Sequence, residues 1–235
     1  MSPTITKTIL VLANSIKKSG RCVAGRELIP CENGKQRIGP WIRPIDPLGD
    51  EGTIDQEMAK IAGKFINPLD VIKIEFTGDA GNANHPEDWN VERTVPWKRV
   101  NSLNPSVLDK MDDDSGDLWG VVSARSRKVA PRAGMQTLRL IKPTGNLEVE
   151  AFLETTSWGP KFRCYLKIAH RGVNHLFSID DPLFSWRHRS VIGRNQVGEK
   201  RVTFPLDPAR TVVVASLTPP LKGNHYKIAA TIFEL

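Results

Sequence analysis

Residues 161–168 alternate apolar and polar side chains, and this period of two limits the segment to one kind of structure. Such alternation is typical of a β-strand with one face in a core and the other in solvent. We expect Arg163, Tyr165 and Lys167 to share the outward face, because every second residue of a strand points the same way. Residues 69–76 repeat the pattern, so a second half-buried strand is expected in the first third of the chain.

Strand patterns dominate the rest of the sequence as well. Further runs lie at 135–141, 146–153, 210–217 and 225–233. The 18 glycines and 17 prolines fall mostly between such runs, where turns are expected. Only two short helices are expected, at 55–65 and at 105–111, the second with Asn104 as its N-cap.

The number of strands predicts the fold class. Each half offers about five strands and at most a short helix, which is the anatomy of an OB-fold, a five-stranded Greek-key barrel. We therefore expect an all-β-dominated chain with two OB-fold-like barrels in tandem. The first domain is expected at 1–111, an acidic and then basic junction at 112–134, and the second domain at 135–235. A β-sandwich stays open, because strand counts do not reveal closure.

Charge indicates the kind of partner. The formal net charge is +7, and residues 118–195 carry 13 Lys and Arg against 5 Asp and Glu. Such a local excess favours a polyanion such as nucleic acid. Apolar runs are too short to span a membrane and no signal region opens the chain, so we expect a cytoplasmic protein with no membrane partner.

The cysteines predict neither a disulfide framework nor a metal site. Cys22, Cys31 and Cys164 are odd in number and widely spaced, so we expect structural thiols. The acidic run at 112–117 lacks the spacing of a calcium loop and is expected to be a solvated linker. No cofactor or metal is expected.

Short motifs near both ends of the chain are similar to a known family. They are Leu12-Ala13-Asn14-Ser15, Gly20-Arg21-Cys22-Val23-Ala24-Gly25, Trp41-Ile42-Arg43-Pro44 and Tyr226-Lys227-Ile228-Ala229-Ala230. Together they resemble the dual OB-fold domain family of prokaryotes. The resemblance implies two tandem OB barrels, nucleic-acid or nucleotide binding, and association with prokaryotic defence or conflict systems. It supplies no catalytic residues.

Two groups of candidate nucleic-acid-binding residues lie in the first half. Lys17, Lys18 and Arg21 belong to a basic hairpin-type loop, and Trp41 with Arg43 places an aromatic ring near a guanidinium. A solvated turn and a core tryptophan are the alternative interpretation.

The second half adds two further candidate surfaces. One is the cluster Trp186, Arg187 and Arg189 with Arg194, and the other is the outward strip of Arg163, Tyr165 and Lys167. Arginine forks suit phosphate and aromatic rings suit unstacked bases, so both patterns indicate a single-stranded ligand. The alternative interpretation of the first surface is an anchoring Trp186 with exposed, solvated arginines. The alternative for the second is an ordinary exposed strand that binds no ligand. A further basic run, Arg125, Arg127, Lys128 and Arg132, has no aromatic neighbour and favours a solvated surface.

The sequence favours a binding module over an enzyme, with two alternatives open. A metal-dependent nuclease would use Asp180 and Asp181 or the loop 85–88. An adaptor would bind a protein effector or a small nucleotide, because a fold does not fix a function.

Overall fold

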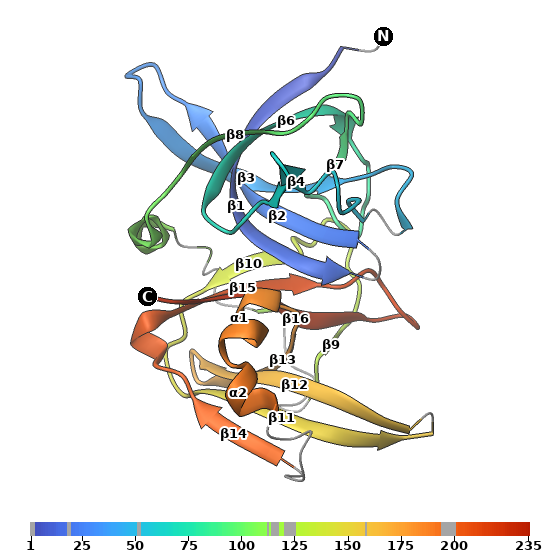
Figure 1. Ribbon diagram of the computed structural model, residues 1–235, viewed down its shortest axis with the longest axis vertical. Coiled ribbons are helices and arrows are strands. Elements are labelled where there is room, and N and C mark those ends of the chain that lie inside the picture. Colours follow the sequence, from blue (N-terminus) through green and yellow to red (C-terminus); the bar gives the residue numbers. More distant parts are fainter. Residues whose placement is uncertain are drawn as a thin grey trace. The chain divides into compact units, whose positions relative to one another are not determined.

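The computed structural model of the protein describes residues 3–17, 20–50, 53–111, 113, 118–119, 126–157, 159–193 and 201–235. The chain forms two compact units, and we describe each by itself (Figure 1). Unit 1 comprises Met1–Met111 with Arg132–Leu138, and unit 2 comprises Asp112–Pro131 with Arg139–Leu235. The domain bounds of 1–111 and 135–235 stay a prediction, because spatial grouping does not by itself define a folding domain.

Unit 1 contains a closed barrel among its described residues. Its strands follow the order β1, β2, β3, β7, β6, and β6 pairs again with β1. The strands are β1 (Ile5–Lys17), β2 (Gly20–Pro30), β3 (Gln36–Ile45), β6 (Asp70–Asp79) and β7 (Asp88–Val91). The β3–β7 pair is parallel and the other pairs are antiparallel, so the chain closes a small Greek-key barrel.

Strand β1 closes this barrel because it serves two partners. Its first half pairs with β6 and its second half with β2, and a register shift between Val11 and Ala13 bends it. Gly25 permits the tight β1–β2 crossing, since a Cβ there would lie 2.1 Å from the Leu10 carbonyl oxygen. The interior is filled by apolar residues that include Ile72, Ile74 and Phe76, so the strand expected at 69–76 is confirmed.

Smaller elements surround the unit 1 barrel. They are the hairpin β4 (Lys60–Ile61) and β5 (Lys64–Phe65), the outer strand β8 (Lys98–Ser102) on β6, and the 3-10 helix η2 (Pro105–Lys110). The helix expected at 55–65 is wrong, because Ala62 and Gly63 adopt positive φ angles of 51° and 74° and turn the chain into the hairpin. The helix expected at 105–111 forms as η2, with the Asn104 side chain accepting from the Ser106 amide.

Unit 2 has the same strand connectivity, but its barrel is left with an open seam, which is our term for the missing ladder between the strands at 147–156 and 211–217 among the described residues. Its sheet has the order β10, β15, β16, β13, β12, β11, β14, and the β13–β16 pair is parallel as β3–β7 is in unit 1. The strands are β10 (Leu138–Ile141), β11 (Leu147–Thr156), β12 (Gly159–His170), β13 (Val173–Ile179), β14 (Arg201–Pro205), β15 (Thr211–Leu217) and β16 (His225–Glu234). In the described residues β14 occupies the edge of β11, where a ladder to β15 would close the barrel.

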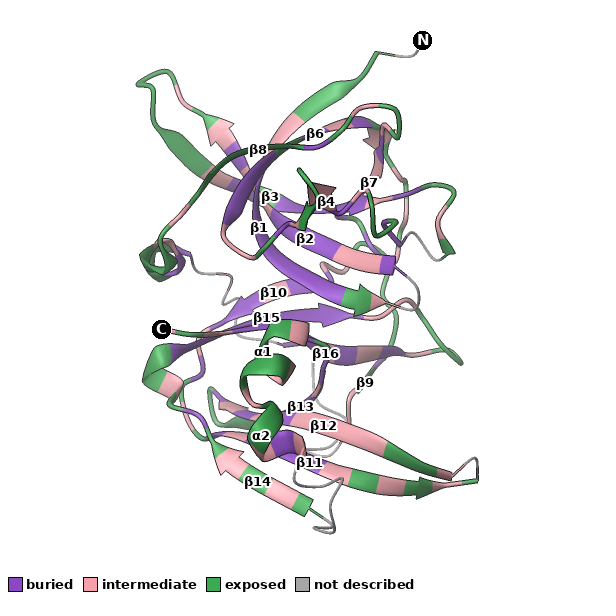
Figure 2. Cartoon of the chain, in the orientation of Figure 1, coloured by how far each residue is buried: buried purple, intermediate pink, exposed green. Residues whose placement is uncertain are grey.

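Short elements complete unit 2. They are β9 (Lys128–Val129) on β16, the 3-10 helix η4 (Pro208–Arg210), and the helices α1 (Pro182–Arg187) and α2 (Arg189–Ile192) between β13 and β14. Figure 2 shows β15 buried along its length, whereas β11, β12 and β14 alternate in exposure. The expected fold class, a mostly β chain built from OB barrels, is confirmed.

Candidate functional site

A row of cations and aromatic rings crosses the outward face of the unit 2 sheet. The Arg201 guanidinium on β14 lies 4.8 Å from the ring of Phe152 on β11, and that ring meets Tyr165 on β12 edge-on at 5.7 Å. The Arg127 guanidinium lies 5.2 Å from Tyr165 and 5.6 Å from Tyr226 on β16. We call these five residues the cation–aromatic row.

Strand register places the row on one face. In the ladders Phe152 is opposite Arg201 on one side and Arg163 on the other, and Tyr165 is opposite Ser178 of β13. Arg127 is fixed above the sheet by a 2.6 Å hydrogen bond that it donates to the Ser178 hydroxyl. The rings are half-buried, so each keeps a surface open to solvent. Such rings can stack on unpaired bases.

Three glutamates of β11 share this face with Phe152. They are Glu148, Glu150 and Glu154, which we call the acidic strip, and each holds a cation of a neighbouring strand. Lys167 lies 2.8 Å from Glu148 and 3.3 Å from Glu150. Hydrogen bonding to Glu148 raises the pKa of Lys167. The candidate face is therefore rich in charge but largely neutralised within itself.

The arginines beside the row are neutralised in the same way. Arg201 lies 2.7 Å from Glu150, and Arg163 lies 2.7 Å from Glu154. The outward strip of Arg163, Tyr165 and Lys167 lies where the alternation predicts, with Leu166 buried on the other side. The sequence gives no sign of the carboxylates that accompany these cations.

Arg127, Phe152, Arg201 and Tyr226 were missed by sequence reasoning. The run at 125–132 favoured a solvated surface, yet Arg127 contacts two rings. Alternation along β11 would have placed Phe152 on the same face as the acidic strip. The contacts of Arg127, Arg201 and Tyr226 join segments that are distant in the sequence. The alternation of apolar and polar residues within one strand does not predict such contacts.

The basic loop of unit 1 forms a smaller cluster. Arg21 is the second residue of β2, and its guanidinium lies 4.2 Å from the ring of Phe65, with the Lys60 ammonium 5.0 Å away from the same ring. Partial burial lowers the pKa of Arg21. Lys17 ends β1 and is half-buried, and Lys18 lies outside the described residues.

Trp41 and Arg43 are inside the protein. They are 2% and 6% exposed, so neither presents a surface to a ligand. The Arg43 Nε donates to Asp88 at 2.5 Å, and its Nη2 lies 3.7 Å from Glu87. Burial lowers the pKa of Arg43, but Asp88 and Glu87 outweigh it and raise this pKa above the ordinary value. The predicted aromatic and guanidinium pair is therefore part of the core.

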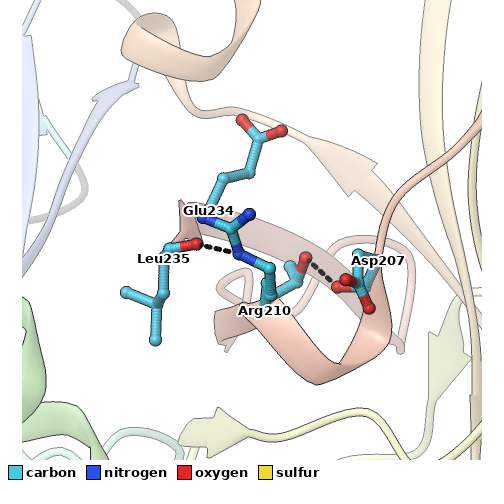
Figure 3. Close-up of a pocket in the computed structure, with 5 residues that line it drawn as sticks. Asp207, Arg210, Glu234 and Leu235 are labelled. Atoms are coloured by element: carbon cyan, nitrogen blue, oxygen red, sulfur yellow. Dashed lines mark hydrogen bonds between the residues drawn. The ribbon is translucent and has the colours of Figure 1, made fainter.

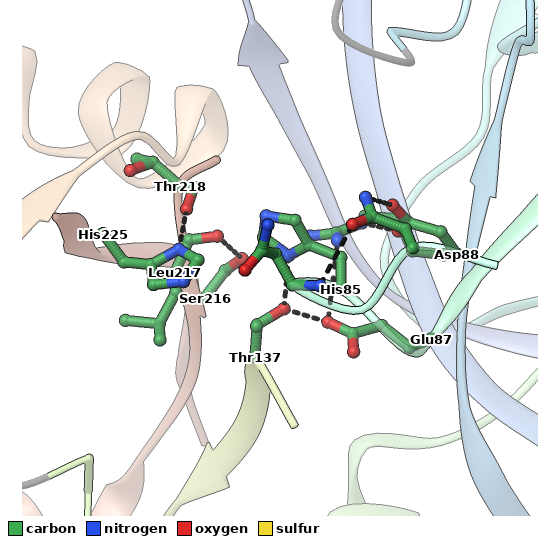
Figure 4. A network of polar contacts seen from close by, with 11 residues as sticks. His85, Glu87, Asp88, Thr137, Ser216, Leu217, Thr218 and His225 are labelled. Atoms are coloured by element: carbon green, nitrogen blue, oxygen red, sulfur yellow. Dashed lines mark hydrogen bonds and ion pairs between the residues drawn. The ribbon is translucent and has the colours of Figure 1, made fainter. Parts of the chain in front are cut away.

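The loop 85–88 is one side of the same buried network (Figure 4). The Thr137 hydroxyl donates to Glu87 and contacts the Nδ1 of His85 at 2.8 Å. Asn82 donates to Asp88 at 3.0 Å. His85, Glu87 and Asp88 are each at most 4% exposed, so the loop forms a buried polar network and does not present the open site that the nuclease alternative would use.

Asp180 and Asp181 do not form a shared site either. Asp181 is buried and caps α1, accepting from the amides of Leu183 and Phe184. It also accepts from the Ile232 amide at 2.8 Å, whereas Asp180 is exposed. Across the described part of the chain, no three His, Cys, Asp or Glu side chains come together as a metal site.

The predicted cluster on α1 is partly open. Trp186 is 64% exposed, and the Arg189 guanidinium lies 4.4 Å from its ring. Arg187 donates to the Ile232 carbonyl at 2.9 Å and pairs with Glu234 at 3.0 Å. Arg194 lies outside the described residues. Trp186 and Arg189 are thus the members of this cluster best placed to meet a ligand.

A polar recess of about 310 Å³ adjoins the end of β16 (Figure 3). It is lined by Asp207, Arg210, Thr211, Glu234 and Leu235. Arg210 donates to the Leu235 carbonyl, and the Thr211 hydroxyl donates to the Asp207 carbonyl. These groups largely satisfy one another, so we assign the recess no ligand.

Comparison with known proteins supports the architecture. The model of a family described as the dual OB-containing domain matches residues 7–232. No curated protein matches the sequence. Within the described residues, no helix is long and apolar enough to cross a membrane.

Proposed function

Because this chain belongs to the dual OB-containing domain family, we propose that it is a non-enzymatic module that binds single-stranded nucleic acid through unit 2. The observation that supports this most directly is the cation–aromatic row. OB-folds bind oligonucleotides on the face of their second and third strands, and the row crosses the corresponding β12 and β13. Tyr165 lies on β12 within that face.

The ligand class follows from the chemistry of the row. Stacking of a base on an aromatic side chain contributes about 1–3 kcal/mol, and every base has a π-face to offer. Bases within a duplex are already stacked on one another, so only an unpaired strand can present them. Phe152, Tyr165 and Tyr226 therefore favour single-stranded DNA or RNA with little sequence preference.

Trp186 and Arg189 are proposed as a second contact of the same ligand. The exposed indole offers a stacking face, and the arginine beside it can meet a phosphate. The family resemblance implies a role as the nucleic-acid-recognising part of a prokaryotic defence or conflict system. We also place this module in the cytoplasm, with a protein effector as a further partner.

The test is fluorescence anisotropy with labelled single-stranded DNA and RNA of about 12 nucleotides, a length within the range of an OB-fold site. Tyr165→Ala is expected to weaken binding by about 5-fold to 150-fold, which corresponds to the loss of one stacked base. Tyr165→Phe keeps the ring and is expected to bind as wild type does. Leu153→Ala is the matched control, because Leu153 is an exposed neighbour of Phe152 on β11 outside the row.

Three results would contradict the proposal. Equal affinity of wild type and Tyr165→Ala would remove the row from the interface. Binding of a mononucleotide or cyclic nucleotide without any oligonucleotide binding would favour the adaptor alternative, and metal-dependent cleavage of the oligonucleotide would favour the nuclease.

A further inference from the structure

The acidic strip lies in the middle of the proposed nucleic-acid-binding face, where carboxylates would repel phosphates. Glu148, Glu150 and Glu154 alternate with Phe152 along β11, so strand geometry keeps all four on one face. An interface that attracts a polyanion gains nothing from three carboxylates at its centre. Their position therefore needs an explanation beyond charge attraction.

Resting on the proposed function, we propose that the acidic strip is a selectivity element that lets unpaired bases bind this face and excludes double-stranded nucleic acid. The carboxylates hold Arg163, Lys167 and Arg201 in ion pairs of 2.7 to 2.8 Å, so the charge of these cations is partly neutralised before any phosphate approaches. The rings of Phe152 and Tyr165 lie beneath the guanidinium groups of Arg201 and Arg127, and both rings are half-buried, so part of each ring is exposed to solvent. The face would therefore bind bases and add little affinity for the phosphate backbone.

Counterion release shows why this discriminates between the two ligand forms. A protein gains affinity for nucleic acid when each cation replaces a counterion at one phosphate, with a salt slope of about −0.9 per contact for duplex and about −0.7 for single strands. A cation that is already paired with a carboxylate gives less of this gain, because the phosphate has to displace the carboxylate. Duplex DNA offers the flat outward face little besides phosphates, whereas a single strand still offers its bases.

Ordinary cross-strand pairing is the competing explanation. Opposite charges on neighbouring strands stabilise a sheet by about 0.2–1 kcal/mol per pair, without any role in binding. The two explanations differ in what happens when the carboxylate is neutralised. A stabilising pair changes only the unfolding of unit 2, whereas a selectivity element changes the ligand preference of the folded protein.

The test compares wild type with the double variant Glu148→Gln and Glu154→Gln. Glutamine keeps the side-chain shape, and both positions are accessible, with side chains 40% and 44% exposed. Loss of Glu154 frees Arg163, whereas Lys167 keeps Glu150 at 3.3 Å. The variant therefore frees one cation fully and a second in part. We leave Glu150 unchanged, because it holds both Lys167 and Arg201.

The variant is expected to gain duplex binding and a steeper salt dependence. The slope should steepen by about 0.9 to 1.8 for duplex and by about 0.7 to 1.4 for single strands. Glu57→Gln is the matched control, because Glu57 pairs with Lys60 at 2.6 Å in unit 1 and is not a member of the row or of the acidic strip. Circular dichroism establishes that each variant is folded, and the conservative change Glu154→Asp should keep the wild-type preference.

The outcomes separate this inference from the proposed function. If wild type binds single strands and the folded double variant keeps the same slope and the same discrimination against duplex, the selectivity role is overturned and the binding function stands. If wild type binds neither form, the proposed function fails and the inference fails with it.

Discussion

Replacing Arg43 by methionine is expected to destabilise unit 1 strongly and to leave nucleic-acid binding by folded protein unchanged. Arg43 lies on β3 with its guanidinium 2.5 Å from Asp88 and 3.7 Å from Glu87, and all three side chains are buried. Methionine fills a similar volume without the charge. The substitution therefore leaves two carboxylates buried beside each other without their cation.

The magnitude follows from that uncompensated charge. Removing one partner of a buried ion pair costs about 3–5 kcal/mol, mostly because the remaining charge stays away from water. Hydrogen bonds from Asn82 and Thr137 still reach the two carboxylates, so a value near the lower end is expected. For a unit of this size the midpoint of thermal unfolding should fall by roughly 12–20 °C.

The assay is thermal and urea unfolding followed by circular dichroism, with binding measured below the new midpoint. A triple variant, Arg43→Met with Glu87→Gln and Asp88→Asn, serves as the control, because neutral amides do not need the cation. It should recover at least half of the loss. A loss below about 1 kcal/mol for Arg43→Met would refute the reasoning. Weaker binding at unchanged stability would instead restore Arg43 as a ligand contact.

Three further predictions concern unit 2. Trp186→Ala should weaken single-strand binding by about 1–3 kcal/mol in anisotropy while changing stability by less than about 1 kcal/mol, because the indole is exposed; unchanged affinity would remove α1 from the interface. Asp181→Ala should cost about 1–3 kcal/mol of unfolding free energy by urea titration, since three backbone amides lose their acceptor; a loss under about 0.5 kcal/mol would contradict this. Burial raises the pKa of Cys164 to about 12, so iodoacetamide at pH 8 should label this thiol roughly 1000-fold more slowly than an ordinary thiol, as followed by mass spectrometry. Because the pKa is higher in the folded than in the unfolded protein, the free energy of unfolding should fall as the pH rises above about 9. Rapid labelling of folded protein would argue against the burial of Cys164.

The sequence predicts strands well where one face is buried. Residues 69–76 and 161–168 form β6 and β12 as predicted, because apolar and polar side chains alternate along a strand that has one buried and one exposed face. Helices were harder to predict, because a short hairpin can imitate helical spacing, as residues 55–65 do. The helix α1 was not predicted, although Asp181 followed by Pro182 is a common helix start, and the Asp181 carboxylate caps the backbone of this helix.

The ion-pair partners of the cations in the candidate site could not be predicted from the sequence. Alternation places Arg163 and Lys167 on the outward face, but the partner of an outward cation depends on the register of the next strand. Here β11 brings Glu154 and Glu148 beside them, which neutralises charges that the sequence alone presents as open. Register is a tertiary property, so net charge along a segment overstates the attraction that the folded face exerts.

The open seam of unit 2 and the cation–aromatic row both follow from the position of β14. In unit 1, β1 pairs with both β2 and β6 and closes the ring, so no edge remains beside it. In unit 2, β14 occupies the edge of β11 (Figure 1). The register of these two strands places Arg201 opposite Phe152. If β15 closed the barrel instead, its wholly buried strand of mainly valine and alanine would lie beside β11, and Phe152 would have no cation. The departure from a closed barrel therefore widens the outward face of unit 2 to the span that the row requires.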